Sequence, residues 1–318
     1  MATDSSGFNF DFMQFRKIAG IGSIVLVVVS LISLAVNQVE WGLDFTGGTI
    51  VEVEYEQSVS PESIRNQLTE AGYEGHVVQY FGSDRDILVR VPPQANLETR
   101  ENAKLGEKVI ETLRDAADQP VSLRRSEFVG PAVGEELTNQ GGIGLMTALG
   151  VVLLYVAFRF QMKFAVGAVV ALFHDVVITL GIFSITRWNF DLTVLAALLA
   201  VIGYSLNDTI VVSDRIRENF RKIRRSTPID VINTSLNQTL GRTLVTSLTT
   251  LLVLFTLLVL GGELIRGFAL GLIIGVIIGT YSSIYVASNM LVVQGISHED
   301  LAVPEKEGAD QQTIDNSF

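Results

Sequence analysis

Six apolar stretches constrain this chain more than any other feature of its sequence. Each is near the roughly 20 residues that a helix needs to cross the hydrocarbon core of a membrane. The predicted spans are residues 18–36, 142–158, 164–185, 192–212, 243–260 and 267–293. Because a segment in lipid must satisfy its backbone hydrogen bonds internally, helices are the expected form. The sequence therefore predicts an α-helical integral membrane protein with six transmembrane helices.

Charge divides the chain between the two sides of that membrane. Residues 37–139 contain 19 Asp and Glu against 9 Lys and Arg, whereas the segments at 159–163 and 213–242 are basic. By the positive-inside rule, both termini are expected in the cytoplasm and residues 37–139 outside it. The first span is too long for a cleaved signal peptide and is interpreted as a retained anchor.

The long polar segment has the pattern of an α+β domain. Val51, Val53 and Tyr55 alternate with glutamates as in a half-buried strand, and Ser60 and Pro61 begin a helix. Further strands are predicted at 76–81, 86–91 and 121–129, and a further helix at 97–117. This βαββαβ order predicts a ferredoxin-like external domain between the first and second transmembrane helices. Since the segment has no nucleophile motif, we expect it to bind or move, not to catalyse.

Four regions follow from these patterns. They are residues 1–36, the cytoplasmic N-terminus and first span; 37–139, the ferredoxin-like domain outside the cytoplasm, in the periplasm; 140–297, a five-helix membrane domain with a basic cytoplasmic loop at 213–242; and 298–318, a disordered acidic cytoplasmic tail. The segment 128–134, FVGPAVG, is predicted as a hinge or a plain linker. In the basic loop, an apolar stripe of Ile216, Phe220 and Ile223 predicts a helix lying on anionic lipids. Nucleic-acid binding is not expected.

Two acids lie inside apolar spans, where a charge is costly and therefore functional by default. Asp208 follows Asn207 in the fourth span, and Asp175 follows His174 in the third. Small residues precede each acid at four-residue steps, namely Gly167 and Ala171 before Asp175, and Ala196, Ala200 and Tyr204 before Asp208. Both acids are thus predicted to face packed protein. For Asp175, an interhelical clamp and a proton relay remain open.

Three further features complete the candidate site. Arg242 begins the fifth span and is expected level with Asp208, above a row of hydroxyls formed by Thr246, Thr249, Thr250 and Thr256. The last span carries Gly267, Gly271, Gly275 and Gly279, a spacing typical of tight helix packing within the chain or with a partner subunit. Asp44, Gly47 and Gly48 predict a tight turn that leads into a strand.

Several kinds of chemistry are not expected from this sequence. It has no cysteine, which rules out disulfides and thiolate metal sites. It also has no GxxxxGK[ST] motif, so it lacks a Walker-type means of using ATP. We expect no cofactor and no metal, and the energy for any work would come from a partner or an ion gradient.

Four stretches in order, WGLDFTGGT, FVGPAVG, HDVVITLGIF and IGYSLNDTIVVSDRIRENFRKIRR, resemble the SecD/SecF family of bacterial protein translocation. The resemblance covers nearly the whole chain. It implies membership of the resistance-nodulation-division superfamily, whose members couple the proton gradient to conformational change. It also implies a place in the bacterial inner membrane and a pairing with SecD. Together the two would assist the SecYEG translocon, with YajC and YidC as further partners, by drawing unfolded preproteins outward.

The resemblance also assigns roles to residues. The GYSLND motif puts the proton-coupling acid at Asp208 and its basic partner at Arg242, with Asp175 in support. Supporting polar residues would be Asn207, His174, Tyr204 and Thr246. Burial disfavours a charged carboxylate while a nearby guanidinium favours it, so a movable pair can bind and release a proton. Each charge that crosses the membrane potential supplies ~2.3 kcal/mol per 100 mV. Protons and sodium ions both remain open as the coupling ion.

Three other functions compete with this interpretation. One is a half-subunit of a related proton-driven exporter of small molecules or lipids. Another is an intramembrane aspartyl protease with Asp175 and Asp208 as an acid dyad, which the missing GxGD context disfavours. A third is a scaffold whose buried acids only hold helices together. Our expectation is that the protein is not an enzyme.

Overall fold

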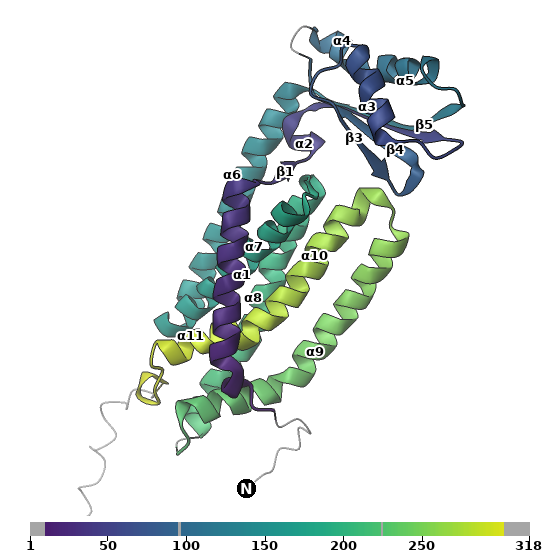
Figure 1. Cartoon of the computed structure of the whole chain (residues 1–318). Coiled ribbons are helices and arrows are strands. Elements are labelled where there is room, and N and C mark those ends of the chain that lie inside the picture. The colour runs from purple at the N-terminus through teal and green to yellow at the C-terminus, as the bar shows by residue number, and fades with distance from the viewer. Residues whose placement is uncertain (1–9, 95–96, 224, 302–318) are drawn as a thin grey trace, which may run out of the picture.

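The structure, a computed structural model, describes residues 10–94, 97–223 and 225–301. Within this part of the chain, six helices are long and apolar enough to cross a membrane, as the sequence predicts. Figure 1 shows them as a bundle with an α/β unit at one end. The helices of the bundle are α1 (Arg16–Val36), α6 (Pro131–Arg159), α7 (Met162–Thr186), α8 (Leu192–Lys222), α9 (Pro228–Leu260) and α10 (Glu263–Ser282), which continues through a π-helical turn, η2 (Ser283–Ala287), into α11 (Ser288–Val293).

The α/β unit contains a four-stranded sheet and three helices. Along the chain they are β2 (Gly48–Tyr55), α3 (Pro61–Glu70), β3 (Val77–Phe81), β4 (Ser83–Val91), α4 (Thr99–Ala103), α5 (Leu105–Asp115) and β5 (Val121–Val129). The strands lie in the order β3-β4-β2-β5 and every neighbouring pair is antiparallel. The element order is the predicted one, except that the second helix is divided at Lys104.

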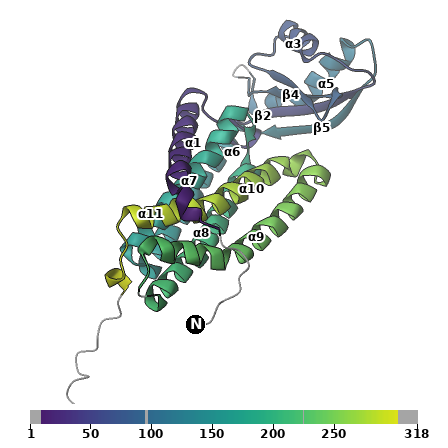
Figure 2. The ribbon, with the colours of Figure 1, turned by 60° about the horizontal axis from the view of Figure 1, so that its bottom comes forward.

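One face of this sheet carries the core of the unit. Val51, Val53 and Tyr55 of β2 are buried, as their alternation predicts, and they pack against Leu68 of α3 and Leu113 of α5. Figures 1 and 2 show α3 and α5 on the side of the sheet that faces away from the helical bundle. The unit therefore has a core separate from that of the membrane helices.

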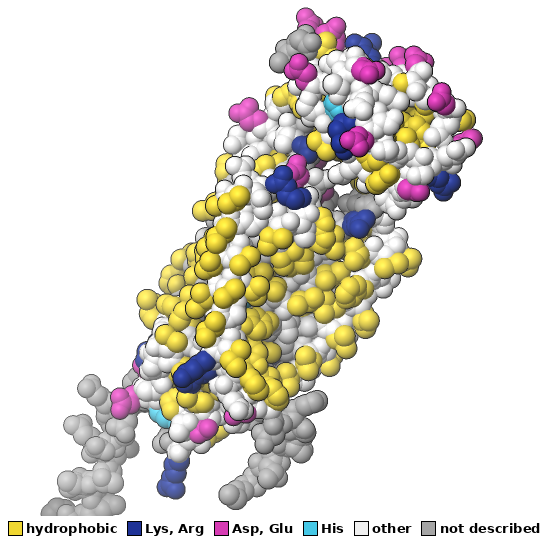
Figure 3. All heavy atoms as spheres, viewed as in Figure 1, with side chains coloured by type: hydrophobic (Ala, Val, Ile, Leu, Met, Phe, Trp, Pro, Cys, Tyr) yellow, Lys and Arg dark blue, Asp and Glu magenta, His cyan; other side chains and the backbone are white. Residues whose placement is uncertain are grey.

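The bundle has a buried centre and exposed apolar edges. The interior side chains come mainly from α7 and α8, whereas α1, α6 and α9 are largely exposed. Figure 3 shows hydrophobic side chains along the bundle, with charged side chains gathered on the α/β unit and at the opposite end. This is the surface expected of a protein whose middle lies in lipid.

The helix predicted in the segment 213–242 is present, but its predicted place on lipid is wrong. α8 continues to Lys222, and α9 begins at Pro228 behind a Thr227–Asp230 capping box and runs without a break through the fifth span. Ile216 and Phe220 are fully or almost fully buried in a protein core. Their stripe faces α9 and α7 instead of lipid, because α8 and α9 pack together beyond the span.

The predicted tail begins later than residue 298. A short 3-10 helix, η3 (Glu299–Leu301), packs Leu301 into the core. Lys163 binds Asp300 at 2.6 Å, and the N–H of Ser297 donates to the same carboxylate at 2.8 Å. These bonds hold the pKa of Asp300 below its usual value. Residues 302–318, which make up the rest of the predicted tail, lie outside the described residues.

Candidate functional site

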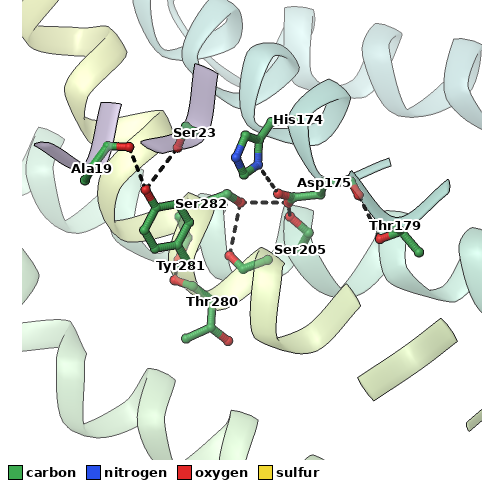
Figure 4. Close-up of polar contacts among 11 residues, drawn as sticks. Ala19, Ser23, His174, Asp175, Thr179, Ser205, Thr280, Tyr281 and Ser282 are labelled. Atoms are coloured by element: carbon green, nitrogen blue, oxygen red, sulfur yellow. Dashed lines mark hydrogen bonds and ion pairs between the residues drawn. The ribbon is translucent and has the colours of Figure 1, made fainter. Parts of the chain in front are cut away.

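Asp175 lies at the centre of a cluster of polar side chains inside the helical bundle. It lies on α7 and is fully buried. His174 Nδ1 lies 2.8 Å from Asp175 Oδ1, the hydroxyl of Ser282 donates to Oδ2 at 2.7 Å, and the hydroxyl of Ser205 donates to the same oxygen. Figure 4 shows these groups converging from α7, α8 and α10. One carboxylate thus joins three helices, which satisfies the requirement that a buried charge be hydrogen-bonded.

A second set of polar contacts extends this cluster toward α1. The hydroxyl of Tyr281 donates to the carbonyl oxygen of Ala19 at 2.7 Å and lies 3.0 Å from Ser23 Oγ. The ring of Tyr281 stacks on that of His174, whose Nε2 is buried without a hydrogen-bond partner. The π-helical turn η2 follows directly, and such turns frequently occur at functional sites.

Asp208 has a different environment from Asp175. It is buried on α8, with 5% of its surface exposed. Its one described hydrogen bond is long, 3.5 Å from Thr243 Oγ1 to Oδ1. The other oxygen, Oδ2, is buried and has no hydrogen-bond partner among the described residues. Asp208 is therefore a buried carboxyl group that the surrounding protein leaves largely unsatisfied.

The predicted partners of Asp208 do not surround it in this conformation. Arg242 is next to Thr243 and hence level with the acid, but its side chain is exposed and acts on Asp208 only electrostatically within the described part of the chain. Asn207 is exposed. Tyr204 donates to Ser247 on α9 at 3.2 Å. Of the predicted supporting residues, His174 alone contacts a buried acid.

The predicted row of threonines faces outward. Thr246, Thr249 and Thr256 are exposed, and each hydroxyl donates to a backbone carbonyl of its own helix. Thr250 bonds in the same way, to the carbonyl of Thr246. The hydroxyl that reaches Asp208 belongs to Thr243, which is buried one turn before Thr246 on α9.

The glycine ridge of α10 packs within the chain, against α8. A Cβ on Gly275 would lie 2.0 Å from Val201 Cγ2, and one on Gly279 would lie 3.1 Å from Ser205 Cβ. Gly267 and Gly271 approach Val194 and Ala197 in the same way, at 2.9 and 3.0 Å. Close contact along this ridge positions Ser205 beside Asp175.

The predicted ridge on α8 is wrong. Ala196 and Ala200 are exposed, whereas Ala197 and Val201 are buried against α10. An α-helix has 3.6 residues per turn, so the residues that share one face are three or four positions apart. Counting only in fours from Asp208 selected a face of α8 that does not pack against α10. On α7 the predicted ridge does pack, since a Cβ on Gly167 would lie 3.2 Å from the carbonyl oxygen of Ala287.

The WGLDFTGGT motif forms a single helical turn, α2 (Leu43–Thr46), followed by two glycines with positive φ. Gly47 has φ +67° and leads into Gly48 at φ +117°, where β2 begins. A Cβ on Gly48 would lie 2.6 Å from the carbonyl oxygen of Val91, so this position requires glycine. Asp44 Oδ2 accepts a hydrogen bond from the N–H of Leu192, the first residue of α8, at 3.0 Å.

Ser205, Ser282 and Thr243 were missed at the sequence level. Each hydroxyl is close in sequence to a recognised feature, Ser205 within the GYSLND motif and Ser282 three residues after Gly279. A search for hydroxyls about one turn from an acid or a ridge glycine would have included Ser205 and Ser282 without giving their partner, and it would have left out Thr243. Among the described residues, no group of three or more His, Cys, Asp or Glu side chains is arranged to hold a metal ion.

Two family models match the chain. The model described as "Protein export membrane protein SecD/SecF, C-terminal" matches residues 108–296, which include Asp175, Asp208 and the glycine ridge. The chain belongs to the SecD/SecF family. A second model, described as the SecD/SecF GG motif, matches residues 32–59 and so includes Asp44 and the two glycines.

Relatives within this family agree over almost the full length. The chain is 49% identical to a protein translocase subunit SecF of Pseudomonas aeruginosa over 93% of this chain and 94% of that protein. It is 48% identical to the SecF proteins of Vibrio alginolyticus and Escherichia coli O157:H7, covering 94% and 96% of this chain and 95% and 94% of those proteins. Its similarity is therefore to the SecF members of the family.

A solved structure has the same arrangement of elements. The crystal structure of SecDF, a translocon-associated membrane protein from Thermus thermophilus, superimposes with a TM-score of 0.81 and 38% identity over 91% of this chain. A crystal structure of SecDF in a super-membrane-facing form gives a TM-score of 0.66 at 37% identity over 90% of this chain. The chain spans 39% of the length of each SecDF chain.

Proposed function

We propose that this chain is an accessory subunit of the bacterial Sec protein-export machinery. It acts with SecD in the inner membrane to couple the proton motive force to preprotein movement and release on the outer side. Support comes from the family matches and from the apolar surfaces of α1, α6 and α9, which leave room for a partner. Contacts with SecYEG, YajC, YidC, unfolded preproteins and anionic lipids belong to the same proposal.

The proposed orientation has both termini in the cytoplasm and the α/β unit, a ferredoxin-like domain, outside. The N–H of Phe10 donates to Asn237 at the end of the bundle farthest from the α/β unit, where the α8–α9 connection also lies. That end carries the exposed cations Arg221 and Lys222. Basic residues on the cytoplasmic side are what the positive-inside rule requires.

The contrast between the two buried acids carries the coupling proposal. Asp175 is held in place by hydrogen bonds with His174 and with hydroxyl groups on α8 and α10. Asp208 has a buried oxygen without a partner, so a proton can bind there without breaking an existing bond. Asp208 is therefore the group that changes its protonation, with Arg242 as its movable counter-charge, and Asp175 holds the helices.

The test is proton-driven export by an Asp208→Asn variant. Asn has nearly the same shape as Asp but cannot exchange a proton, so assembly with SecD is expected to persist while gradient-dependent export into inverted membrane vesicles is lost. Asp214→Asn is the matched control, because this acid lies on the same helix but forms surface ion pairs with Arg159 and Arg217. Full gradient-dependent export by Asp208→Asn contradicts the coupling role, and purification without SecD contradicts the pairing.

The geometry supports a non-enzymatic role over a protease. An acid dyad needs two carboxyl groups that share one proton. Here Asp175 bonds to groups on α8 and α10, whereas Asp208 faces Thr243 on α9. An independent exporter would not require SecD, so purification of the chain without SecD would favour that function. Repeating the export assay without sodium distinguishes the coupling ion.

A further inference from the structure

The first turn of α8 is capped by two carboxylates. N–H groups at the start of a helix have no intrahelical acceptor. Asp191, the residue before the helix, accepts from the N–H of Val194 at 2.9 Å, which is an ordinary local cap. The N–H of Leu192 donates instead to Asp44, at 3.0 Å, from a position 148 residues earlier in the chain. The second cap thus connects α8 to a distant segment.

That segment is fixed against the start of α8 by its backbone. β1 (Glu40–Trp41) pairs in parallel with β6 (Asn189–Phe190), and the N–H of Gly42 donates to the carbonyl oxygen of Phe190 at 2.8 Å. A Cβ on Gly42 would lie 2.8 Å from Asp191 Cβ. We call this set of contacts between residues 40–46 and 189–192 the α8 joint.

Aromatic rings fill the α8 joint. Trp41 packs edge-on against Phe45 and Phe190, with ring centroids 5.4 and 5.7 Å apart, and Phe45 stacks on Phe190 at 6.2 Å. Such pairs stabilise a contact beyond the area they bury. The joint is therefore a packed contact between two parts of the chain and not a single hydrogen bond at a loose surface.

The other end of the α8 joint leads into the α/β unit. α2 is followed directly by β2, the strand that pairs with both β4 and β5. α6 also packs here, since a Cβ on Gly134 would lie 3.0 Å from Gly47 N and 3.1 Å from the carbonyl oxygen of Phe45. The predicted hinge at 128–134 is thus packed against α2, which leaves no free linker at this point. Figure 1 shows β1 and α2 between the bundle and the sheet.

We propose that Asp44 is a positioning residue that couples α8 to the α/β unit, so that movement of α8 reaches the inner strand β2. The inference rests on the proposed function, in which Asp208 changes its charge. Asp208 is on the same helix, about 24 Å from Leu192 at 1.5 Å per residue. A carboxylate at a helix N-terminus is attracted by the helix dipole as well as by the N–H group, so the contact resists both separation and tilting.

The first experiment compares three variants of the full chain in membranes with SecD. Asp44→Ala removes the carboxylate bond of the α8 joint and leaves its strand pair and rings in place, and gradient-dependent export is expected to fall about tenfold, the effect of one charge-assisted hydrogen bond. Asp44→Asn retains an acceptor and is expected to restore most of the activity. Asp191→Ala removes the local cap of the same helix but keeps the Cβ and backbone that meet Gly42, so the α8 joint stays intact. It is the matched control and is expected to export normally.

A fourth variant removes the same bond from the other side. Leu192→Pro deletes the N–H donor at the first helical position, where proline is well tolerated. We expect the same loss as in Asp44→Ala, and the double variant is expected to lose no more than either single one. If Asp44→Ala fails to accumulate in the membrane, Leu192→Pro still tests the bond.

A reversible cross-link separates coupling from helix capping. The chain has no cysteine. Glu40 and Asn189 are partners in the β1–β6 pair, where neighbouring strands are about 4.8 Å apart and within disulfide reach. Glu40→Cys with Asn189→Cys, added to Asp44→Ala, is expected to restore export when oxidised and to lose it when reduced. A pure capping defect would not respond to oxidation.

The export assay distinguishes failure of the coupling role of Asp44 from failure of the proposed function. Wild-type chain without gradient-dependent export refutes the proposed function. Wild-type export together with normal export by Asp44→Ala and Leu192→Pro refutes the coupling role of Asp44 alone. An equal loss in Asp191→Ala, or a loss that oxidation does not reverse, reduces Asp44 to a helix cap and also overturns the proposal.

Discussion

Asp175 and Asp208 should differ sharply when each is replaced by alanine. In Asp175→Ala, the hydroxyls of Ser205 and Ser282 lose their common acceptor inside the bundle, and His174 loses its contact with the carboxyl group. Two of these contacts, with Ser205 on α8 and Ser282 on α10, are interhelical. Interhelical hydrogen bonds in membranes average ~0.6 kcal/mol and reach ~1.7 kcal/mol, so the two amount to about 1–3 kcal/mol. Asp208→Ala removes one 3.5 Å contact and should cost at most about 1 kcal/mol.

Thermal stability in detergent measures this difference. The chain is purified with SecD, heated in steps, and the fraction that stays monodisperse is followed by size-exclusion chromatography. Each kcal/mol corresponds to about 2–4 °C in Tm for about 150–250 residues and to less for a larger protein, so Asp175→Ala is expected to melt about 3–10 °C lower. Asp208→Ala is expected to melt within about 3 °C of wild type. Asp175→Asn, which retains one acceptor oxygen, should fall between the two.

The opposite order of stability would refute the reasoning. If Asp208→Ala melts as low as Asp175→Ala, then Asp208 holds the fold and its unsatisfied oxygen is not a sign of a titrating group. If Asp175→Ala melts like wild type and loses export, Asp175 belongs to the proton path and the clamp interpretation is wrong. Stability and export must therefore be measured on the same preparations.

Two further predictions concern the packing of α10 and the core of the α/β unit. Gly275→Ala is expected to destabilise the chain by about 1–3 kcal/mol, and adding Val201→Ala should recover part of this loss, because the new Cβ meets the Val201 side chain. Gly203→Ala, with nothing within 4 Å, is the control in the same assay, and strictly additive effects would contradict the described contact. Burial raises the pKa of Tyr55 to about 12. The buried neutral Tyr55 therefore contributes its full stabilisation below about pH 10, and ~3 kcal/mol of the free energy of unfolding is lost as the pH rises toward 12. Tyr55→Phe should remove this loss of stability at alkaline pH. Tyrosinate absorbance that shows Tyr55 ionising near pH 10 would disprove the prediction.

Length and periodicity made most of the fold predictable. The six spans follow from apolar length alone, and the strand of Val51, Val53 and Tyr55 follows from strict alternation, since both are local properties of the chain. In the basic segment 213–242, periodicity predicts a helix but not the surface against which that helix packs. Ile216 and Phe220 form the same stripe whether they face lipid or protein, and only the presence of α9 beside them decides between the two.

The acids of the candidate site were predictable, but most of their surroundings were not. Asp175 and Asp208 stand out because ionisable residues are rare in apolar spans. Ser205, Ser282 and Thr243 do not stand out, because a hydroxyl in a membrane helix can equally bond its own backbone, as Thr246 does. Which hydroxyl meets an acid depends on the rotation of each helix, and a step of four residues does not determine that rotation.

The contacts of α8 suggest where a proton-driven movement has to begin. Toward α10, Val201 and Ser205 fit against glycines with no space for sliding, and Asp175 bonds across the same contact. At the level of Asp208, α9 is held by one long hydrogen bond. Under the proposed function, a change of charge at Asp208 would therefore act first on the α8–α9 contact, while α7, α8 and α10 would stay together. Because Asp44 connects this group to β2, the α/β unit would move with it, and loss of export in both Asp208→Asn and Asp44→Ala is the result that this sequence of events requires.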